Sequence, residues 1–226
     1  MRKYYKTELH THTNPVSACS HVEPKRLVEI YKENGYDSVV ITNHFTLELK
    51  GDTIDEKIKW YLEDYYKGME AGKIVGLNVI LGVEITLTEN KNDYLIFGIC
   101  PEDLIKAYKM LPYGIERLYR EFKNEKNIII QAHPFRDNME RANPESLDGI
   151  EVFNMEPGMN SRIGLAAKYA SRNNMIATCG SDFHKEGHEC LCSILTEKPL
   201  ENSYDVAGIL KSGDYNMSIG NYLVSI

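Results

Sequence analysis

The sequence predicts an α/β fold in which about seven strands close, or nearly close, a (β/α) barrel. Apolar strand-like runs alternate with amphipathic helical segments along most of the 226 residues, and this alternation favours right-handed parallel crossovers. Histidines and acids stand directly after several of these runs. A barrel builds its active site from residues at the carboxyl ends of its strands, so this placement supports the same fold.

Each expected element follows from a local pattern. Apolar runs predict strands at residues 4–9, 38–42, 78–84, 93–99 (a weaker run), 127–132, 149–153 and 175–179. Three- and four-residue apolar spacing predicts helices at about 23–34, 53–75, 101–109, 113–125 and 159–173. Pro24 suits the first turn of the first helix, and Asn34-Gly35 closes it. The aromatic stripe of the long helix is typical of core packing. The tail, 190–226, predicts two or three short strands around a short helix.

Composition restricts the function classes. A hydrophobic fraction of 42% and a charged fraction of 26% are globular values, so we expect one domain over residues 1–226. The net charge of −7 and the absence of a basic stripe make a nucleic acid duplex an unlikely partner. No apolar run approaches the roughly 20 residues of a membrane span, and the N-terminus lacks the apolar core of a signal peptide. The five cysteines form no C-x-x-C pair, so reduced thiols and a cytoplasmic location are expected.

The polar residues at the predicted strand ends are mostly imidazoles and carboxylates. His10 and His12 lie two residues apart, so on a strand both rings face one side and can bind one ion. Glu84 ends an apolar strand, where a carboxylate is costly unless it is paired or metal-bound. His44 and His133 follow two other strands, and Asp182 and His184 form a second pair two residues apart. Each of these residues alone suits a cap or a polar core position, but together they predict a metal centre.

The order H-x-H, T-x-H, G-x-E, H-P and S-D-x-H resembles that of the PHP (polymerase and histidinol phosphatase) family, from about residue 5 to 195. The resemblance implies a distorted (β/α)7 TIM-like barrel that holds two or three divalent metal ions and acts as a phosphoesterase. Carried over by motif, it implies that one ion is bound by His10, His12, Glu84 and Asp182. Glu84 would bridge to a second ion held with His133, and His44 and His184 would hold a third. Asp182 and His184 would also be catalytic.

Three departures from the family pattern affect this ligand set. Ser17-Ala18-Cys19 stands where the family often has S-D-G, so the third ion lacks an expected acid, for which His21 and Cys19 are candidate replacements. Asn43 replaces the acid of T-D-H, which we expect to weaken the orientation of His44. The ligand that many relatives have between G-x-E and H-P is not evident, and the nearest candidates are Tyr94 and Cys100.

The expected reaction is hydrolysis of a phosphate ester by a metal-activated hydroxide. Mixed nitrogen and oxygen ligands suit Zn, Mn or Fe. Arg136 lies two residues beyond the H-P pair and is predicted to clamp an anionic, small phosphorylated substrate, the alternative being a surface arginine. Glu151 and Asn154 are candidates for a supporting role, although strand alternation also allows Glu151 to point away.

Two other functions stay open on the sequence. One is an amidohydrolase-like C–N hydrolase that uses the same metals, and the other is a degenerate, non-catalytic metal-binding module. The sequence does not predict the identity of the substrate, the native metal or the oligomeric state.

Overall fold

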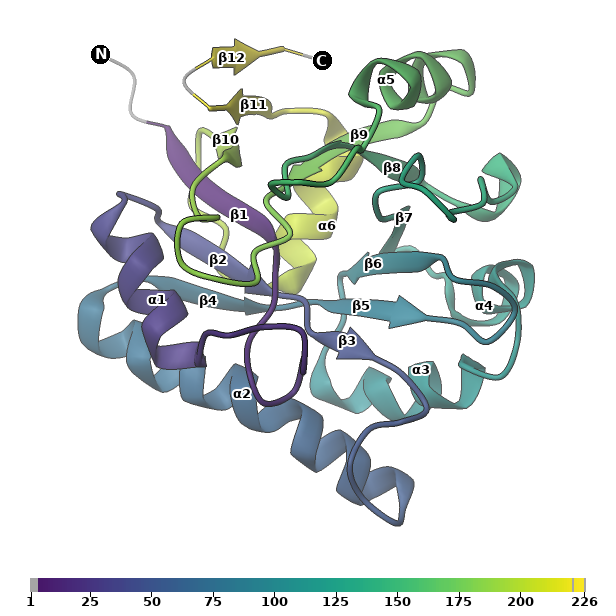
Figure 1. Ribbon diagram of the computed structural model, residues 1–226, viewed down its shortest axis with the longest axis horizontal. Helices are drawn as coiled ribbons and strands as arrows, with labels where there is room; N and C mark the ends of the chain where they lie inside the picture. The colour runs from purple at the N-terminus through teal and green to yellow at the C-terminus, as the bar shows by residue number, and fades with distance from the viewer. Residues whose placement is uncertain (1–3, 221, 226) are drawn as a thin grey trace.

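The computed structural model describes residues 4–220 and 222–225 as an α/β fold with two six-stranded mixed sheets (Figure 1). The first sheet has the order β12-β11-β10-β1-β2-β4, and the second has the order β3-β5-β6-β7-β8-β9. The strands are β1 (Tyr5–Thr11), β2 (Ser38–Ile41), β3 (His44–Phe45), β4 (Asn78–Leu81), β5 (Val83–Thr86), β6 (Asp93–Phe97), β7 (Ile128–Gln131), β8 (Gly149–Asn154), β9 (Ile176–Gly180), β10 (Cys192–Thr196), β11 (Asn216–Ile219) and β12 (Tyr222–Val224).

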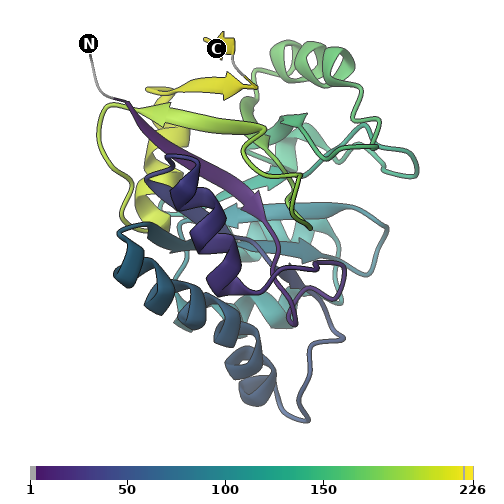
Figure 2. The same ribbon diagram turned by 60° about the vertical axis from the view of Figure 1, so that its left-hand side comes forward.

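The helices lie where apolar spacing predicts them. They are α1 (Pro24–Glu33), α2 (Ile54–Val75), α3 (Leu104–Met110), α4 (Ile115–Phe122), α5 (Ile163–Arg172) and α6 (Ser203–Ser212), with short 3-10 turns at Pro101–Asp103 and Pro144–Ser146. A capping box of Thr53 and Glu56 begins α2, and Gly76 ends it in the left-handed conformation. Figures 1 and 2 show α1 and α2 side by side, and α5 packs beside β8. Within the described ranges, no helix combines the length and the apolar character needed to cross a bilayer.

The predicted α/β architecture is confirmed, but the described residues form two sheets rather than one continuous barrel ladder. Strand β10 pairs antiparallel with β1 along the edge that β9 would need for closure. In the part of the chain that the structure describes, the ladder pairing between these two regions is reduced to an isolated parallel bridge of Thr11 and Phe183. The two sheets also meet where the chain passes from β2 to β3 and from β4 to β5. The runs predicted as strands 38–42 and 78–84 lead from the first sheet into the second at these points, and the ladder is interrupted between β2 and β3 and between β4 and β5.

Strand β6 runs antiparallel to both of its neighbours, β5 and β7, so the prediction of parallel crossovers is wrong at this point. The connection from β5 to β6 covers only residues 87–92, which is too short for a parallel crossover. As a result the amino end of β6, not its carboxyl end, lies at the edge where β5 and β7 end. Asp93 is therefore brought to that edge.

A common apolar interior joins the two sheets. It contains buried side chains from β1, β2 and β4 of one sheet and from β6, β7 and β9 of the other, together with Val206, Ala207 and Leu210 of α6. The amide of Gly98 donates to the backbone carbonyl of Ser203 at the start of α6, so α6 packs near the carboxyl end of β6. That is the end opposite Asp93, and the edge carrying Asp93 stays uncovered by α6.

Gly82, between β4 and β5, is a position where an added methyl group has little room. A Cβ there would lie 2.8 Å from side-chain carbons of both Thr42 and Val40. We expect Gly82→Ala to lower the free energy of unfolding by about 1–3 kcal/mol through overpacking, as measured by chemical denaturation.

Gly208→Ala is the matched control. Gly208 lies inside α6 with no atom within 4 Å of a built Cβ, so the same change should raise the free energy of unfolding by about 0.5–1 kcal/mol. Equal effects of the two substitutions would contradict the close packing at Gly82.

Candidate metal centre

The seven residues predicted as metal ligands converge on one region. His10 and His12 lie near the end of β1, His44 and Glu84 are register partners in the parallel pair of β3 and β5, and His133 follows β7. Asp182 and His184 follow β9. The side chains come from five separate strand ends, so the apolar runs fix the backbone and leave these polar groups together at one edge.

Glu84 is the centre of the group. One of its carboxylate oxygens, Oε1, lies 3.1 Å from His10 Nε2 and 3.2 Å from His133 Nε2. The other, Oε2, lies 2.9 Å from His44 Nδ1 and 3.3 Å from His12 Nε2. Burial alone would raise the pKa of Glu84, but His10 and His44 hold that pKa well below its ordinary value. A single carboxylate thus contacts four imidazoles.

Asp182 approaches the same group from the last parallel strand. Its Oδ1 lies 3.1 Å from His12 Nε2 and 3.4 Å from His10 Nε2. Asp182 and His133 both have positive φ angles, 50° and 30°, a region that residues with a Cβ rarely adopt. Such strained backbone is typical of functional sites, where the surrounding structure holds it in place.

Asp93 is a candidate ligand that the sequence analysis missed. Its Oδ2 lies 3.8 Å from His133 Nε2, and Glu84, Asp93 and His133 form one group of closely spaced ligand atoms. The proposed alternatives do not reach the site, because Tyr94 is buried in the apolar core and the Cys100 thiol contacts Asp103. The short 87–92 connection is the sequence feature that could have indicated Asp93. It forces β6 to run antiparallel, which brings the first residue of β6 to the edge where the other candidate ligands lie.

Glu151 orients His10 from behind. Its Oε1 accepts from His10 Nδ1 at 2.9 Å, which directs His10 Nε2 toward Glu84. Its Oε2 accepts from the amide of His133 at 3.1 Å and from Asn154 Nδ2 at 2.8 Å. Glu151 therefore points into the centre, and its contacts match the partners that hold metal-binding histidines in a fixed tautomer and orientation.

His12 is oriented by a chain of hydrogen bonds through Asn43. The Ser17 hydroxyl donates to Asn43 Oδ1 at 2.9 Å and accepts from His12 Nδ1 at 3.2 Å. Asn43 Nδ2 in turn donates to Thr13 Oγ1, whose hydroxyl donates to the buried carboxylate of Asp64. The expectation that Asn43 weakens His44 is not supported, because its side chain supports His12 through Ser17.

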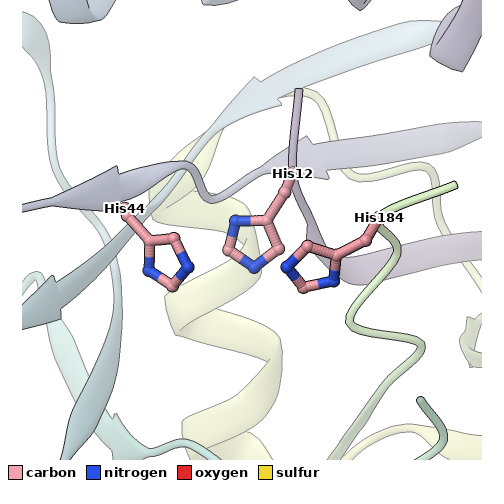
Figure 3. A group of neighbouring side chains, drawn as sticks. All are labelled: His12, His44 and His184. Atoms are coloured by element: carbon pink, nitrogen blue, oxygen red, sulfur yellow. The ribbon is translucent and has the colours of Figure 1, made fainter. Parts of the chain in front are cut away.

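A third group of ligand atoms consists of His12, His44 and His184, all within 4.8 Å of one another. Figure 3 shows His12 lying between the other two rings, with ring centroids 4.5 Å from His44 and 4.4 Å from His184. Burial and His44 lower the pKa of His12 to about 3, so its ring is neutral. Cys19 and His21 line the pocket beside this group. Burial raises the pKa of the Cys19 thiol, but hydrogen bonds to His184 and His44 outweigh it and lower that pKa to about 7.

Arg136 is part of the pocket wall and is mostly buried, so it is not a surface arginine. Its Nη2 donates to Asp182 Oδ2 at 2.5 Å and to Asn154 Oδ1 at 2.5 Å, and it lies 2.9 Å from Glu156 Oε2. Its Nε is buried without a hydrogen-bond partner among the described residues. Arg136 is therefore already paired with acids of the centre, and only part of its guanidinium is available to an anionic substrate.

The donor set fits divalent cations. Four groups of imidazole and carboxylate atoms lie within bridging distance of a single ion each, and nitrogen with oxygen donors suits borderline transition metals. In the described part of the chain, Glu84 Oε2 and His133 Nδ1 are buried without a hydrogen-bond partner, and a bound cation would satisfy the carboxylate oxygen. A pocket of about 400 Å³ opens over these groups, a size suited to a small molecule.

Comparisons with known proteins agree with this architecture. The model of the PHP domain family matches residues 8–208. An uncharacterized protein of Methanocaldococcus jannaschii is 25% identical over an alignment of 142 residues. The alignment covers 58% of this chain and 66% of that protein.

Two solved structures are similar in fold. A two-domain protein of Bacteroides vulgatus, which contains a predicted PHP-like metal-dependent phosphoesterase, has a TM-score of 0.68 and 17% identity, covering 98% of this chain and 66% of its own. PsfC from Pseudomonas syringae has a TM-score of 0.64 and 16% identity, covering 91% and 88% of the two chains. The chain thus spans 66% of the length of the archaeal and Bacteroides proteins, and at these identities the two solved structures show the fold alone.

Glu151→Gln tests the support behind His10. Glutamine keeps the shape but offers one acceptor oxygen where the carboxylate accepts from three donors. We expect the affinity for Zn²⁺ to fall by about 10–100-fold with the fold retained, as measured by calorimetric titration of metal-free protein. Glu145→Gln, at an exposed residue of the Pro144–Ser146 turn, should leave the affinity unchanged. An unaltered affinity in Glu151→Gln would contradict the supporting role.

Metal binding near neutral pH should release protons. Burial lowers the pKa of His44, but Glu84 and Cys19 outweigh it and raise that pKa well above 6.5. Protons therefore compete with the metal below this raised pKa, and the affinity should fall as the pH falls. Titrations of Zn²⁺ in buffers with different ionisation enthalpies measure the release, which should decrease in His44→Ala. Binding heats that do not depend on the buffer would contradict this expectation.

Proposed function

This chain belongs to the PHP domain family, and from that premise we propose that it is a metal-dependent hydrolase of phosphoric esters that acts on a small phosphorylated substrate. The observation that carries the proposal is the position of Glu84. Its two oxygens contact His10 and His133 on one side and His44 and His12 on the other. A carboxylate in this position is suited to bridge ions, as multinuclear phosphoesterase centres require.

The ligand assignment follows the groups of donor atoms. His10, His12, Glu84 and Asp182 would hold one ion, and Glu84, Asp93 and His133 would hold a second. A third ion would be bound by His44 and His184, which lie beside His12. When bound, Zn, Mn or Fe at such a centre lowers the pKa of a coordinated water to about 7 and neutralises charge on the phosphoryl group.

Asp182 and His184 are the residues that we assign to catalysis besides metal binding. Asp182 is held by Arg136 through Oδ2, which leaves Oδ1 facing His10 and His12. His184 Nδ1 donates to the backbone carbonyl of Asp182 at 2.7 Å, so Nε2 is the ring nitrogen left to bind an ion. His184 lies at the exposed side of the group and serves as a ligand of the third ion or, in a two-ion centre, as a proton donor to the leaving group.

Arg136 has a narrower role than a free phosphate clamp. Its Nη2 is engaged by Asp182, Asn154 and Glu156, and its Nε is without a partner among the described residues. We assign to it the orientation of Asp182 and a single charged contact to the substrate. Arg136 therefore favours an anionic substrate less strongly than its sequence position predicts, and C–N hydrolysis stays an outcome of the test.

The test combines metal analysis with hydrolysis. Purified protein is assayed for transition metals and then for turnover of p-nitrophenyl phosphate and bis(p-nitrophenyl) phosphate with added Mn²⁺. We expect two or more metal equivalents and turnover of at least one ester. Metal without turnover of either ester, together with hydrolysis of an amide, would replace the proposal by the C–N hydrolase. Failure to take up metal would exclude the centre altogether.

His10→Ala and Asp182→Asn should remove activity because each deletes a donor shared by the buried group. We expect kcat to fall by more than about 100-fold, the upper end of the cost of losing a residue behind the ligands. Asp214→Asn, at an exposed aspartate after α6, is the matched control and should keep wild-type kcat. Near wild-type turnover in either ligand variant, with the far-ultraviolet circular dichroism unchanged, would contradict the assignment.

A further inference from the structure

In the loop Ser17-Ala18-Cys19, the side chains of Ser17 and Cys19 lie in different surroundings. Ser17 turns inward, where its hydroxyl contacts His12 and Asn43. Cys19 lines the pocket together with His44 and His184 and is exposed to solvent. Ala18 occupies the position at which the motif pattern predicts an acid, and the next residue, Cys19, provides a thiol that is accessible to an entering ion.

The loop is attached to the segment that carries His184. The Ser20 hydroxyl lies 3.0 Å from the carbonyl of His12 and 3.2 Å from the carbonyl of His184. The amide of His21 donates to the carbonyl of His184 at 2.8 Å. These contacts flank Cys19 on its carboxyl side, so its position relative to His184 is fixed by the backbone.

An independent observation indicates that a cation belongs beside Cys19. Glu84 Oε2 is fully buried and has no hydrogen-bond partner among the described residues, yet it approaches His44 Nδ1 and His12 Nε2 at 2.9 and 3.3 Å. The rings of His44 and His184 lie on either side of His12 (Figure 3). A buried carboxylate oxygen and three imidazoles therefore face the same space that the thiol borders.

We propose that Cys19 supplies a thiolate to the third ion, together with His44 and His184, and that this position selects zinc, iron or cobalt over manganese or magnesium. The inference rests on the proposed function, because it assumes the multinuclear centre. Coordination forms a sulfur–metal bond and releases the thiol proton to solvent. Thiolate is a soft donor, and soft donors discriminate against the hard cations that prefer oxygen. The other three ligand groups contain carboxylates and no sulfur, so the centre would combine hard oxygen ligands with one soft sulfur ligand.

Cobalt(II) titration of metal-free protein, without oxygen and with a reductant, reports this bond directly. We expect a thiolate-to-cobalt charge-transfer band in the near ultraviolet as the third equivalent binds. In Cys19→Ser the band should disappear and the affinity for the last equivalent should fall by at least about 10-fold, while the visible d–d absorption of the first two equivalents persists. Cys19→Asp should restore the third equivalent without the band and bind Mn²⁺ there more tightly than the wild type does.

Cys100→Ser is the matched control, since its thiol contacts Asp103 and does not line this pocket; it should keep the band. Cobalt binding without a charge-transfer band in the wild type, or a band that survives in Cys19→Ser, would overturn the thiolate ligand and leave the phosphoesterase proposal intact. A protein that shows no d–d absorption at all would contradict the centre itself and both proposals with it.

Discussion

The contact of one buried carboxylate with four imidazoles is the interaction on which the rest of the site depends. Glu84 is fully buried, and such a charge is tolerated only when opposite charges or metal ions compensate it. Its neighbours come from β1, β3 and the end of β7, so the compensation also fixes how these strand ends are arranged around β5. The backbone pairing of β3 with β5 places His44 directly beside Glu84, since the two residues are register partners. His10 and His44 provide the compensating charge, so loss of either imidazole would leave part of the buried charge of Glu84 uncompensated.

Local sequence signals predicted which polar residues lie together, because each candidate ligand follows or ends a predicted strand. What they did not predict was strand direction. An apolar run reads the same in parallel and antiparallel strands, so Asp93, at the start of β6, was not recognised as lying beside His133. Barrel closure failed for a related reason. The edge of β1 is occupied by β10, and competition between two distant segments for one edge is a non-local property that composition and spacing do not encode.

The supporting residues show the same limit at the level of single side chains. Strand alternation left open whether Glu151 points inward. In the structure Ile150 and Val152 pack in one apolar cluster, and Glu151 between them faces the other side of β8, where it contacts His10. Asn43 acts on His12 through Ser17, which is distant in sequence but adjacent in space. Hydrogen-bond networks between loops depend on the assembled fold, so sequence motifs identify the ligands more readily than the residues that orient them.

The balance of charge in the pocket links metal occupancy to the kind of substrate. Glu84, Asp93, Asp182 and Glu156 line it, against a single arginine, Arg136, which is already engaged by two of these acids. Burial, followed by the charge of Glu84, raises the pKa of Asp93 to about 6. Lys185 also lines the pocket, but the four acids outnumber Lys185 and Arg136, so without metal these acids oppose the entry of a phosphate group. If the substrate is an anionic ester, as proposed, bound cations would assist its entry as well as activate water, whereas the entry of a neutral amide would not depend on metal occupancy. The dependence of substrate binding on metal content is thus the property that separates the two hydrolase chemistries compatible with this fold.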